Sequence, residues 1–465
     1  MFYENGKAKD LKLAYIGGGS RGWAWMLMSD LALESALEGT VYLYDIDHQA
    51  AKNNEIIGND IPYYYPEYNN FKYVATETAE EALKDADFVI MSILPGTFDE
   101  MESDVHTPEK YGIYQSVGDT VGLGGLIRAL RTLPIYEGYA KLIEKLCPNA
   151  WVINYTNPMT VCTDILYKTF PGIKAIGCCH EVFGTQDVLI DALREMCGVE
   201  DATRDDIKVN VTGVNHFTWL TEAKYKDIDI FPIYREFCEK YRKTGHSREK
   251  DADKNWLNRY FKGDQRVKFD LFLRYGYIAA AGDRHLAEFC PSNWYMSSPE
   301  MVDSWGFSLT PVSWRKDRTV DLIAQSERMV KREQKFEIKP SGEKGVAQMK
   351  ALLGLEDLIT NVNIPNQGQI PNLPVGAVVE TNAYFTSNSV TPMFAGEMPS
   401  GILGLTERIV ANQQLTVEAV MKKDLSIAFE AFVNDPQNKL DMATSKKLFD
   451  EMIDNTKEYL SMYNI

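Results

Sequence analysis

One strand–turn–helix segment near the N-terminus constrains the fold of this chain most. Residues 11–16, LKLAYI, form a short apolar run of the kind that makes a buried strand. Residues 17–22, GGGSRG, follow in the pattern GxGxxG, and residues 23–37 then have the composition of a helix. A second apolar run, residues 41–45, ends at Asp45. This order predicts a βαβ unit, the repeating element of a Rossmann-like sheet.

The glycine turn predicts a binding site for a dinucleotide. In such turns the first glycine permits the tight bend, the second lets the backbone approach a pyrophosphate, and the third allows close packing of helix on strand. The start of the helix offers N–H groups and a partial positive charge to phosphate. A carboxylate at Asp45 accepts hydrogen bonds from ribose hydroxyls, which favours NAD over NADP, and Asp47 either shares this role or is a simple loop carboxylate. The predicted cofactor-binding residues are Gly17, Gly18, Gly19, Ser20, Arg21, Gly22, Asp45, Asp47, Pro95 and Asn154.

The first 200 residues alternate between strand-like and helix-like segments. Such alternation predicts an α/β domain, with a parallel sheet covered by helices on both faces. Further strands are expected at residues 86–96, 150–158 and 174–181, and the main helix at residues 126–146.

The pattern changes after about residue 200. Residues 207–225 alternate like antiparallel strands, with a break at residues 213–215. We expect amphipathic helices over 232–275, an exposed polar loop at 334–345, strands at 377–393 and helices from 404 onward.

Length and composition limit the classes to which the chain can belong. A chain of 465 residues exceeds one ordinary core, so we expect an NAD-binding domain over 1–200 and a second α/β domain over 201–465. No apolar stretch approaches a membrane span, and the N-terminus has no apolar signal region. The seven cysteines include no CxxC pair, which favours reduced thiols and a cytoplasmic protein. A net charge of −17 disfavours nucleic acid as a partner.

Polar motifs stand at the ends of the predicted strands, where ligands bind in open parallel sheets. They are NYTNP at 154–158, CCHE at 178–181, NHF at 215–217, and DRHLAE at 283–288. A thiolate and an imidazole can hold a divalent ion that keeps positions open for substrate oxygens, and Cys179 and His216 are the candidates. From the residues alone, a small core cysteine and a structural histidine are the more common interpretations and remain open.

The motifs together resemble glycoside hydrolase family 4, the NAD- and manganese-dependent glycosidases. The matching segments occur in order over residues 13–290, and the remainder is also similar to the family's C-terminal half. The resemblance implies a Rossmann-like N-terminal sheet, a mixed α/β C-terminal domain similar to the lactate/malate dehydrogenase fold, and a homodimer or homotetramer. The segments are AYIGGGSRGW, YQSVGDTVGLGGLIRALRTLP, VINYTNPM, GCCHEVFG, GVNHFTW and AAGDRHLAEF.

The resemblance also implies a metal and a substrate. It assigns Cys179 and His216 to Mn²⁺ or another divalent metal. The motif CHEV at 179–182, with GDRH, looks most like the α-galacturonidase branch, so a small glycoside or oligosaccharide ending in α-D-galacturonic acid is the expected substrate. Members that act on phosphorylated sugars carry a different residue at the position of His180. An α-glucosidase, α-galactosidase or α-glucuronidase of the same family remains the alternative.

The mechanism implied by the resemblance is hydrolysis through transient oxidation of the sugar. NAD⁺ takes hydride from C3, a base removes the acidified C2 proton, the aglycone leaves, water adds and NADH returns the hydride. This chemistry departs from the two-carboxylate arrangement of most glycosidases. Asp283 is the expected base, with Tyr275 as the alternative, and His180 and Asp119 are candidates for acid–base work on the leaving group.

A uronate substrate carries a carboxylate, which arginine can hold through two parallel hydrogen bonds. Arg284 is the first candidate, followed by His285 and Arg128, and a surface ion pair is the alternative interpretation for Arg284. Asn157, like Asn154, is expected to bind sugar hydroxyls or the nicotinamide, unless it only caps a turn.

Two other classes of protein fit the glycine turn less well. An NAD-dependent 2-hydroxy acid dehydrogenase would need no metal and would release NADH. The motifs CCHE and NHF do not suit such an enzyme. A non-enzymatic NAD sensor would not need so many polar groups at the strand ends, because such groups are costly to bury unless they are used.

Overall fold

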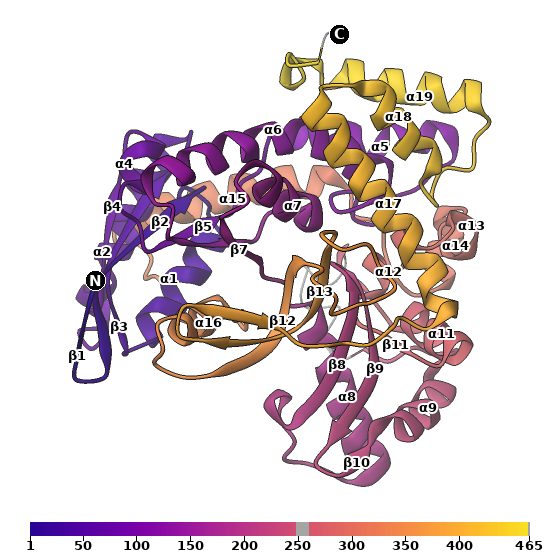
Figure 1. The fold of residues 1–465 in the computed structure, drawn as a ribbon, viewed down its shortest axis with the longest axis horizontal. Coiled ribbons are helices and arrows are strands. Elements are labelled where there is room, and N and C mark those ends of the chain that lie inside the picture. The colour runs from indigo at the N-terminus through magenta and orange to yellow at the C-terminus, as the bar shows by residue number, and fades with distance from the viewer. Residues whose placement is uncertain (248–259, 464–465) are drawn as a thin grey trace.

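The computed structural model describes residues 1–247 and 260–463. It contains two sheets with helices packed around them (Figure 1). The larger sheet consists of β1 (Phe2–Glu4), β2 (Lys7–Ile16), β3 (Leu37–Tyr44), β4 (Phe71–Ala75), β5 (Phe88–Met91), β6 (Trp151–Asn154), β7 (Lys174–Gly177), β12 (Leu358–Pro365), β13 (Val378–Thr386) and β14 (Ser389–Pro392). The smaller sheet consists of β8 (Ile207–Val214), β9 (Phe217–Tyr225), β10 (Ile228–Asp229) and β11 (Ile278–Ala279).

Most helices of the N-terminal half cover the parallel strands, but the helix that begins at Glu181 packs beside the smaller sheet (Figure 1). Two helices of the C-terminal half, which begin at Val312 and Gly345, pack against the N-terminal half, and the last helices extend over the top in Figure 1. Both halves of the chain contain α-helices. They are α1 (Trp23–Leu33), α2 (His48–Asn59), α3 (Ile61–Tyr64), α4 (Ala79–Leu83), α5 (Phe98–His106), α6 (Gly122–Leu146), α7 (Met159–Thr169), α8 (Glu181–Cys197), α9 (Ile230–Tyr241), α11 (Arg266–Tyr275), α12 (Asp283–Phe289), α13 (Ser292–Tyr295), α14 (Pro299–Ser304), α15 (Val312–Val330), α16 (Gly345–Leu352), α17 (Ser400–Lys422), α18 (Leu425–Asn434) and α19 (Met442–Asn455).

Six neighbouring strands of the larger sheet run parallel, in the order β4-β3-β2-β5-β6-β7. The chain fills one side of β2 first and then returns to the other side through β5. The loops after β2 and β5 therefore separate at the point where the strand order reverses, which is where ligands bind in sheets of this kind. The predicted α/β class with a Rossmann-like parallel sheet is confirmed.

The second half of the chain extends this sheet instead of forming a separate one. β12 pairs antiparallel with β7 through Asn363 and Gly177, and β13 and β14 follow outward. One hydrophobic core combines side chains from β2 and β3 with others from α16, β12 and β13. The boundary near residue 200 stays a prediction, because the sheet itself is shared by both halves.

Several local predictions need correction. The sequence analysis missed β4, and the helix expected to reach residue 37 ends at Leu33 because β3 begins at Leu37. Residues 334–345 are irregular, as expected, but they are not a free loop. Phe336 is only 6% exposed, and the Ser341 N–H donates to Asp30 of α1 at 2.9 Å, so this segment packs against the Rossmann-like half.

Other local predictions are confirmed with shifted ends. The hairpin of β8 and β9 turns at Asn215 and His216, because Gly213 and Val214 still pair with β9. The helices expected over 232–275 are α9 and α11, and residues 248–259 of that range lie outside the described residues. The hairpin near 377–393 and the C-terminal helices are present.

Two further findings concern the chain as a whole. The seven cysteines are all free thiols. In the described ranges, no helix combines the length and apolar character that crossing a membrane requires.

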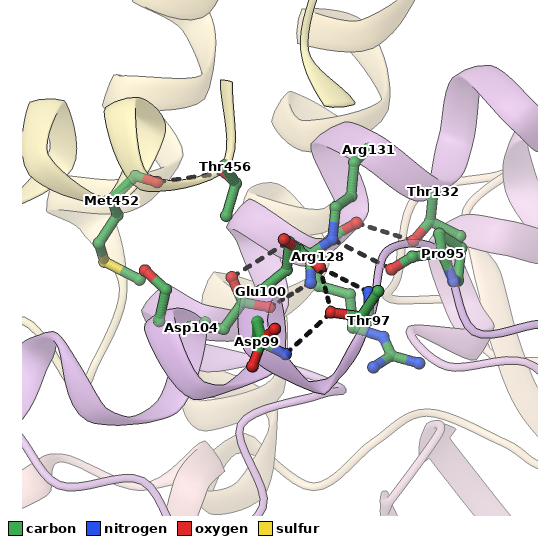
Figure 2. A network of polar contacts seen from close by, with 12 residues as sticks. Pro95, Thr97, Asp99, Glu100, Asp104, Arg128, Arg131, Thr132, Met452 and Thr456 are labelled. Atoms are coloured by element: carbon green, nitrogen blue, oxygen red, sulfur yellow. Dashed lines mark hydrogen bonds and ion pairs between the residues drawn. The ribbon is translucent and has the colours of Figure 1, made fainter. Parts of the chain in front are cut away.

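Two arginines on α6 fix the loops at the strand ends. Arg131, only 1% exposed, binds both carboxylate oxygens of the fully buried Asp104 on α5, with Nη1 at 3.0 Å from Oδ1 (Figure 2). Its Nε donates to the carbonyl of Pro95 in the loop after β5 at 3.2 Å. One turn earlier, the Nε of Arg128 donates to the carbonyl of Asn157 in the loop after β6 at 3.0 Å. Helix α6 therefore holds both loops in place.

We predict that Arg131→Met destabilises the protein strongly. The substitution leaves the Asp104 carboxylate buried without its partner, which costs about 3–5 kcal/mol in the free energy of unfolding. Urea unfolding measures this loss. The matched control is Arg332→Met, which removes a largely exposed two-point pair with Asp60 and should cost less than about 1 kcal/mol. Equal losses in the two variants would contradict the prediction.

Candidate active site

The first two glycines of the turn after β2 have no room for a side chain. A Cβ at Gly17 would lie 1.9 Å from the carbonyl oxygen of Ser92, and the φ of Gly17 is +93°. A Cβ at Gly18 would lie 2.8 Å from the Cα of Leu43 on β3. The turn therefore brings its backbone close to the neighbouring strands, as the sequence predicted for a pyrophosphate site.

The third glycine of the motif does not have the predicted packing role. A Cβ at Gly22 would meet no atom within 4 Å, so close packing of helix on strand does not require a glycine there. Gly19 has that role instead, because its Cβ would lie 2.8 Å from Ala50 of α2 and 2.9 Å from the Asp45 carboxyl carbon. The tight contact is with α2, and the motif alone did not identify this helix.

The two carboxylates after β3 have different roles. Asp45 accepts one backbone N–H on each oxygen, from Gly19 and from Asp47, both at 2.9 Å, and burial raises its pKa. A carboxylate has about four acceptor positions, so capacity for ribose hydroxyls remains. Asp47 caps α2 by accepting from the Ala50 N–H at 3.0 Å and pairs with Arg21 at 3.2 Å. A cofactor-binding role for Asp47 and Arg21 stays a prediction.

Two polar side chains stabilise the glycine turn through hydrogen bonds. The Ser20 hydroxyl accepts from the Trp23 N–H at 3.2 Å, so it caps the start of α1. The fully buried amide of Asn54 on α2 donates to the carbonyls of Gly18 and Ser20 at 2.8 and 3.0 Å. The sequence analysis missed Asn54, because it lies in a helix with no recognisable motif.

Asn154 at the end of β6 and Asn157 in the loop after it differ in whether the side-chain oxygen already accepts hydrogen bonds. The Asn154 oxygen accepts from the Tyr136 hydroxyl at 2.6 Å and from the Thr156 N–H at 3.0 Å. This is the turn-capping alternative, and cofactor binding by Asn154 and Pro95 stays a prediction. The Asn157 oxygen Oδ1 is buried and has no hydrogen-bond partner among the described residues, so it remains a candidate acceptor for a ligand hydroxyl.

The motifs that contain the two predicted metal ligands lie next to each other at the ends of β7 and β8. Cys179 follows β7 and is 4% exposed, and His216 lies in the β8–β9 turn at a φ of 63° and is 6% exposed. The thiol contacts the side chain of Asn215, the residue that precedes His216. The structure therefore brings the two motifs together from segments 37 residues apart in the chain.

A hydrogen-bond relay fixes which nitrogen of His216 can bind a metal. The Thr120 hydroxyl donates to Asp119 at 2.9 Å and also lies 3.2 Å from Nδ1 of His216. Because the hydroxyl has one hydrogen and the ionised carboxylate has none to give, Thr120 must accept from an Nδ1–H. The lone pair of His216 is then on Nε2, which is the arrangement found in metal-binding histidines.

The donor set fits a divalent cation. Burial, together with the nearby charges of Glu380 and Glu181, holds the pKa of Cys179 well above its usual value, so a thiolate there requires a compensating positive charge. Burial, reinforced by His285, lowers the pKa of His216 to about 3, which keeps the imidazole neutral. The described residues contain no group of three or more His, Cys, Asp or Glu side chains suited to a metal, and the assignment of Cys179 and His216 as ligands stays a prediction.

A second cluster surrounds Glu181, the first residue of α8. Its Oε2 accepts from the Gly282 N–H at 2.7 Å, and its Oε1 lies 3.8 Å from His285 and 3.9 Å from His180. The carboxylate of Glu343, 2.7 Å from Nδ1 of His180, raises the pKa of that imidazole to about 9. His180 is therefore protonated at neutral pH, as a proton donor must be, and its side chain is about half exposed.

His285 lies beside the metal pair. Its ring centroid is 3.9 Å from that of His216, and its Nδ1 is buried without a hydrogen-bond partner in the described part of the chain. The predicted substrate role of His285 is compatible with this position and stays a prediction.

Asp283 is buried at the start of α12. Its Oδ1 accepts from the Lys268 N–H at 3.1 Å, and its Oδ2 has no partner among the described residues. Burial raises the pKa of Asp283 to about 6, against the opposing effect of the N–H groups at the start of α11. A carboxylate with a pKa near the working pH and one free oxygen is suited to act as a general base.

Tyr275, the alternative base, lies elsewhere. Its ring is 6.0 Å from that of Trp219 and packs beside Gly401 of α17, and the charges nearest to it are those of Arg274 and Asp270. None of these residues belongs to the cluster around Cys179. Tyr275 therefore stays a prediction that the structure does not bring into the candidate site.

Three guanidinium groups lie within electrostatic reach of Asp119. Burial would raise the pKa of Asp119, but Arg128 and Arg315, with His285, outweigh it and lower that pKa. Arg284 also lies within electrostatic reach of both Asp119 and Arg315. Asp119 is therefore ionised, which disfavours it as a proton donor. The sequence analysis predicted two of these arginines and missed Arg315.

The supporting residues that the sequence analysis missed come from segments without a motif. Lys268 on α11 donates from Nζ to Thr185 of α8 at 3.0 Å, and burial lowers its pKa. Asn361 of β12 bridges the Cys179 carbonyl and Glu380 of β13 at 3.2 and 2.6 Å. The only signal for these residues in the sequence was Glu380, a carboxylate within a strand-like run.

Comparison with known proteins identifies the family. The model named "Family 4 glycosyl hydrolase" matches residues 12–195, and that of the "Family 4 glycosyl hydrolase C-terminal domain" matches residues 211–438. The chain belongs to glycosyl hydrolase family 4. The resemblance stated from the motifs is thereby confirmed, and the chain is a glycosidase.

Within the family, several relatives match over almost the whole chain. An α-galacturonidase of Thermoanaerobacterium saccharolyticum is 57% identical over 465 residues, which is 100% of both chains. An α-galacturonidase of Bacillus subtilis is 51% identical over 443 residues, covering 95% of this chain and 97% of the relative. A crystal structure of a putative glucosidase from Bacillus subtilis superposes with a TM-score of 0.91 at 50% identity, covering 96% of this chain and 100% of that one.

In this family 4 member, we predict that Thr120→Val weakens metal binding. Loss of the hydroxyl removes the partner that holds His216 as the Nδ1–H tautomer, and losses of such supporting contacts lower metal affinity by about 10–100-fold. Titration with Mn²⁺, followed by electron paramagnetic resonance of the free ion, measures the change. Thr120→Ser should retain the affinity.

The matched control is Thr406→Val on α17, a buried threonine whose hydroxyl donates only within its own helix, to Ile402 at 3.0 Å. Its Mn²⁺ affinity should match that of the wild type. Unchanged affinity in Thr120→Val would exclude the relay.

Proposed function

We propose that this glycosidase is an α-galacturonidase, which hydrolyses terminal α-D-galacturonic acid from small glycosides or oligosaccharides with NAD and a divalent metal such as Mn²⁺. The observation that carries the proposal is the position of Asp119. It connects through Thr120 to the metal ligand His216 and faces the guanidinium groups of Arg128 and Arg315. A metal pair that suits sugar hydroxyls thus lies beside a basic group that suits a carboxylate. The α-galacturonidase relatives support the same substrate.

The residues fit both cofactors. The turn at Gly17 and Gly18 and the start of α1 suit a pyrophosphate, and Asp45 suits ribose hydroxyls. Cys179 and His216 suit a divalent ion. When bound, NAD⁺ supplies a hydride acceptor and the metal a Lewis acid for the sugar hydroxyls.

The side chains of the protein would move the protons. Asp283, with its Oδ2 free and its pKa raised to about 6, is largely ionised at neutral pH and accepts the proton from C2 of the sugar. The backbone N–H of Lys268 fixes the other oxygen at 3.1 Å. His180, kept protonated by Glu343, donates to the leaving oxygen. Asp119 stays ionised and orients Thr120 and the arginines.

The remaining features of the proposed enzyme follow from the family and from composition. We propose a homodimer or homotetramer in the cytoplasm, with small uronic acid-containing substrates and no nucleic-acid partner. The net charge of −17 is consistent with solubility and with exclusion of polyanions.

Hydrolysis of p-nitrophenyl α-glycosides tests the proposed function. The panel holds the galacturonide, glucuronide, galactoside and glucoside, each with and without NAD⁺, Mn²⁺ and a thiol reductant. We expect cleavage of the galacturonide only when all three additions are present, with little net change in absorbance at 340 nm. A higher kcat/KM on another sugar of the panel, with the same dependence, would replace the substrate and retain the family chemistry. Steady accumulation of NADH with a hydroxy acid would replace glycoside hydrolysis by dehydrogenation.

We predict that Gly17→Ala and Gly22→Ala differ sharply in NAD⁺ binding. The Cβ of the first variant collides with the Ser92 carbonyl and displaces the turn, whereas that of the second meets nothing. We expect a loss of affinity on the order of tenfold or more for Gly17→Ala, and less than about twofold for Gly22→Ala. Isothermal titration with NAD⁺ measures both, and far-UV circular dichroism confirms that each variant is folded. Equal affinities in the two variants would place the cofactor elsewhere.

A further inference from the structure

We propose that Arg315, near the start of α15, binds the carboxylate of the uronic acid and makes the enzyme prefer acidic over neutral sugars. The inference rests on the proposed function and adds to it the residue that determines specificity. Arg315 belongs to none of the motifs that the sequence analysis used, because it follows them by about 30 residues.

Positive charges gather around Arg315. Its guanidinium lies within electrostatic reach of those of Arg128 and Arg284 and of the Asp119 carboxylate. The other two arginines also reach further carboxylates, Arg128 that of Asp104 and Arg284 those of Glu181 and Glu288. Arg284 on α12 and Arg315 on α15 approach Asp119 from the C-terminal half, whereas Arg128 lies on α6. A concentration of positive charge in a protein of net charge −17 indicates an anionic ligand.

The other two arginines are engaged by the protein. Arg284 donates from Nε to the Ser308 carbonyl at 3.1 Å and from Nη2 to Ser116 and Thr310, and its guanidinium lies 4.7 Å from the Phe261 ring. Arg128 donates from Nε to the Asn157 carbonyl. Both therefore act first as structural anchors for the loops around the site.

Arg315 lacks such partners. Its Nε is buried and makes no hydrogen bond to any described residue, and no carboxylate of the described chain lies within the 4.0 Å of an ion pair. A buried N–H without an acceptor is costly, whereas a carboxylate fits the planar fork of a guanidinium through two parallel hydrogen bonds. The next residue, Lys316, shows the contrast, because it pairs with Asp99 and Glu102 of α5.

Packing on α5 fixes the first turn of α15. Val312, 1% exposed, packs with Met101 and Val105 of α5, and its N–H donates to His106 at 3.3 Å. The Trp314 ring lies 4.9 Å from that of Phe261. Arg315 therefore extends from a rigid element, so that its guanidinium can discriminate between a carboxylate and the hydroxymethyl group of a neutral sugar.

Kinetics of Arg315→Gln test the inference on the enzyme loaded with NAD⁺ and Mn²⁺. We expect kcat/KM on p-nitrophenyl α-galacturonide to fall by about 30-fold or more, as for removal of one partner of a buried charge pair. The smaller activity on the α-galactoside should stay within about threefold. Binding of D-galacturonic acid, measured by isothermal titration, should weaken in parallel. Arg315→Lys should fall between Arg315→Gln and the wild type, because an ammonium keeps the charge and loses the fork.

Arg328→Gln is the matched control, since Arg328 lies on the exposed side of the same helix and its Nε donates to Gln334 at 3.0 Å. Its kinetics should match those of the wild type. If the wild type cleaves galacturonides and Arg315→Gln keeps both that activity and its affinity for galacturonic acid, the inference is wrong and the proposed function stands. If the wild type neither cleaves galacturonides nor binds galacturonic acid, both are overturned. If Arg315→Gln does not fold, Arg315→Lys decides, and unchanged galacturonide kinetics there contradict the inference.

Discussion

The buried ion pair between Arg131 and Asp104 is the interaction on which the geometry of the site depends. Neither side chain can turn toward solvent, because both are almost fully buried and each would leave an uncompensated charge. The pair locks α6 against α5 and holds the Pro95 carbonyl, and Arg128 on the same helix holds that of Asn157. The loops that carry Pro95 and Asn157, two of the predicted binding residues, are thus held in place before a ligand binds. The loss of conformational entropy on substrate binding is therefore smaller.

Two buried acids of the candidate site have raised pKa values. Burial raises the pKa of Glu288 to about 8 and that of Glu380 to about 7, so Glu288 is largely protonated at neutral pH and Glu380 is protonated in part. Glu288 still accepts from the N–H groups of Val117 and Gly118 at 2.7 and 2.8 Å, which supports the loop that ends in Asp119.

Residues of the candidate site could be predicted from the sequence only where they belong to a local motif. The glycine turn, Asp45, Cys179 and His216 could be proposed from the sequence because each lies in a motif at a strand end, and the structure brings the motifs of Cys179 and His216 together. Arg315 and Glu343 were missed because tertiary packing alone delivers them, the first by α15 on α5 and the second by a segment that composition suggested was an exposed loop. The packing role predicted for Gly22 was wrong because it was taken from the general GxGxxG pattern. The sequence does not show which atoms surround that residue.

The shared sheet has a consequence for biosynthesis. The edge strand β7 acquires its neighbour only when β12, some 180 residues later, has left the ribosome, and Tyr463 finally donates to the Leu130 carbonyl on α6 at 3.0 Å. During translation, at roughly 5–20 residues per second, the cofactor half therefore waits on the order of ten seconds or more with an unpaired strand edge. We expect the unpaired edge of β7 to bind chaperones while the chain is being synthesised. A chain that is released early by a stalled ribosome would contain nearly all the motifs but an incomplete sheet.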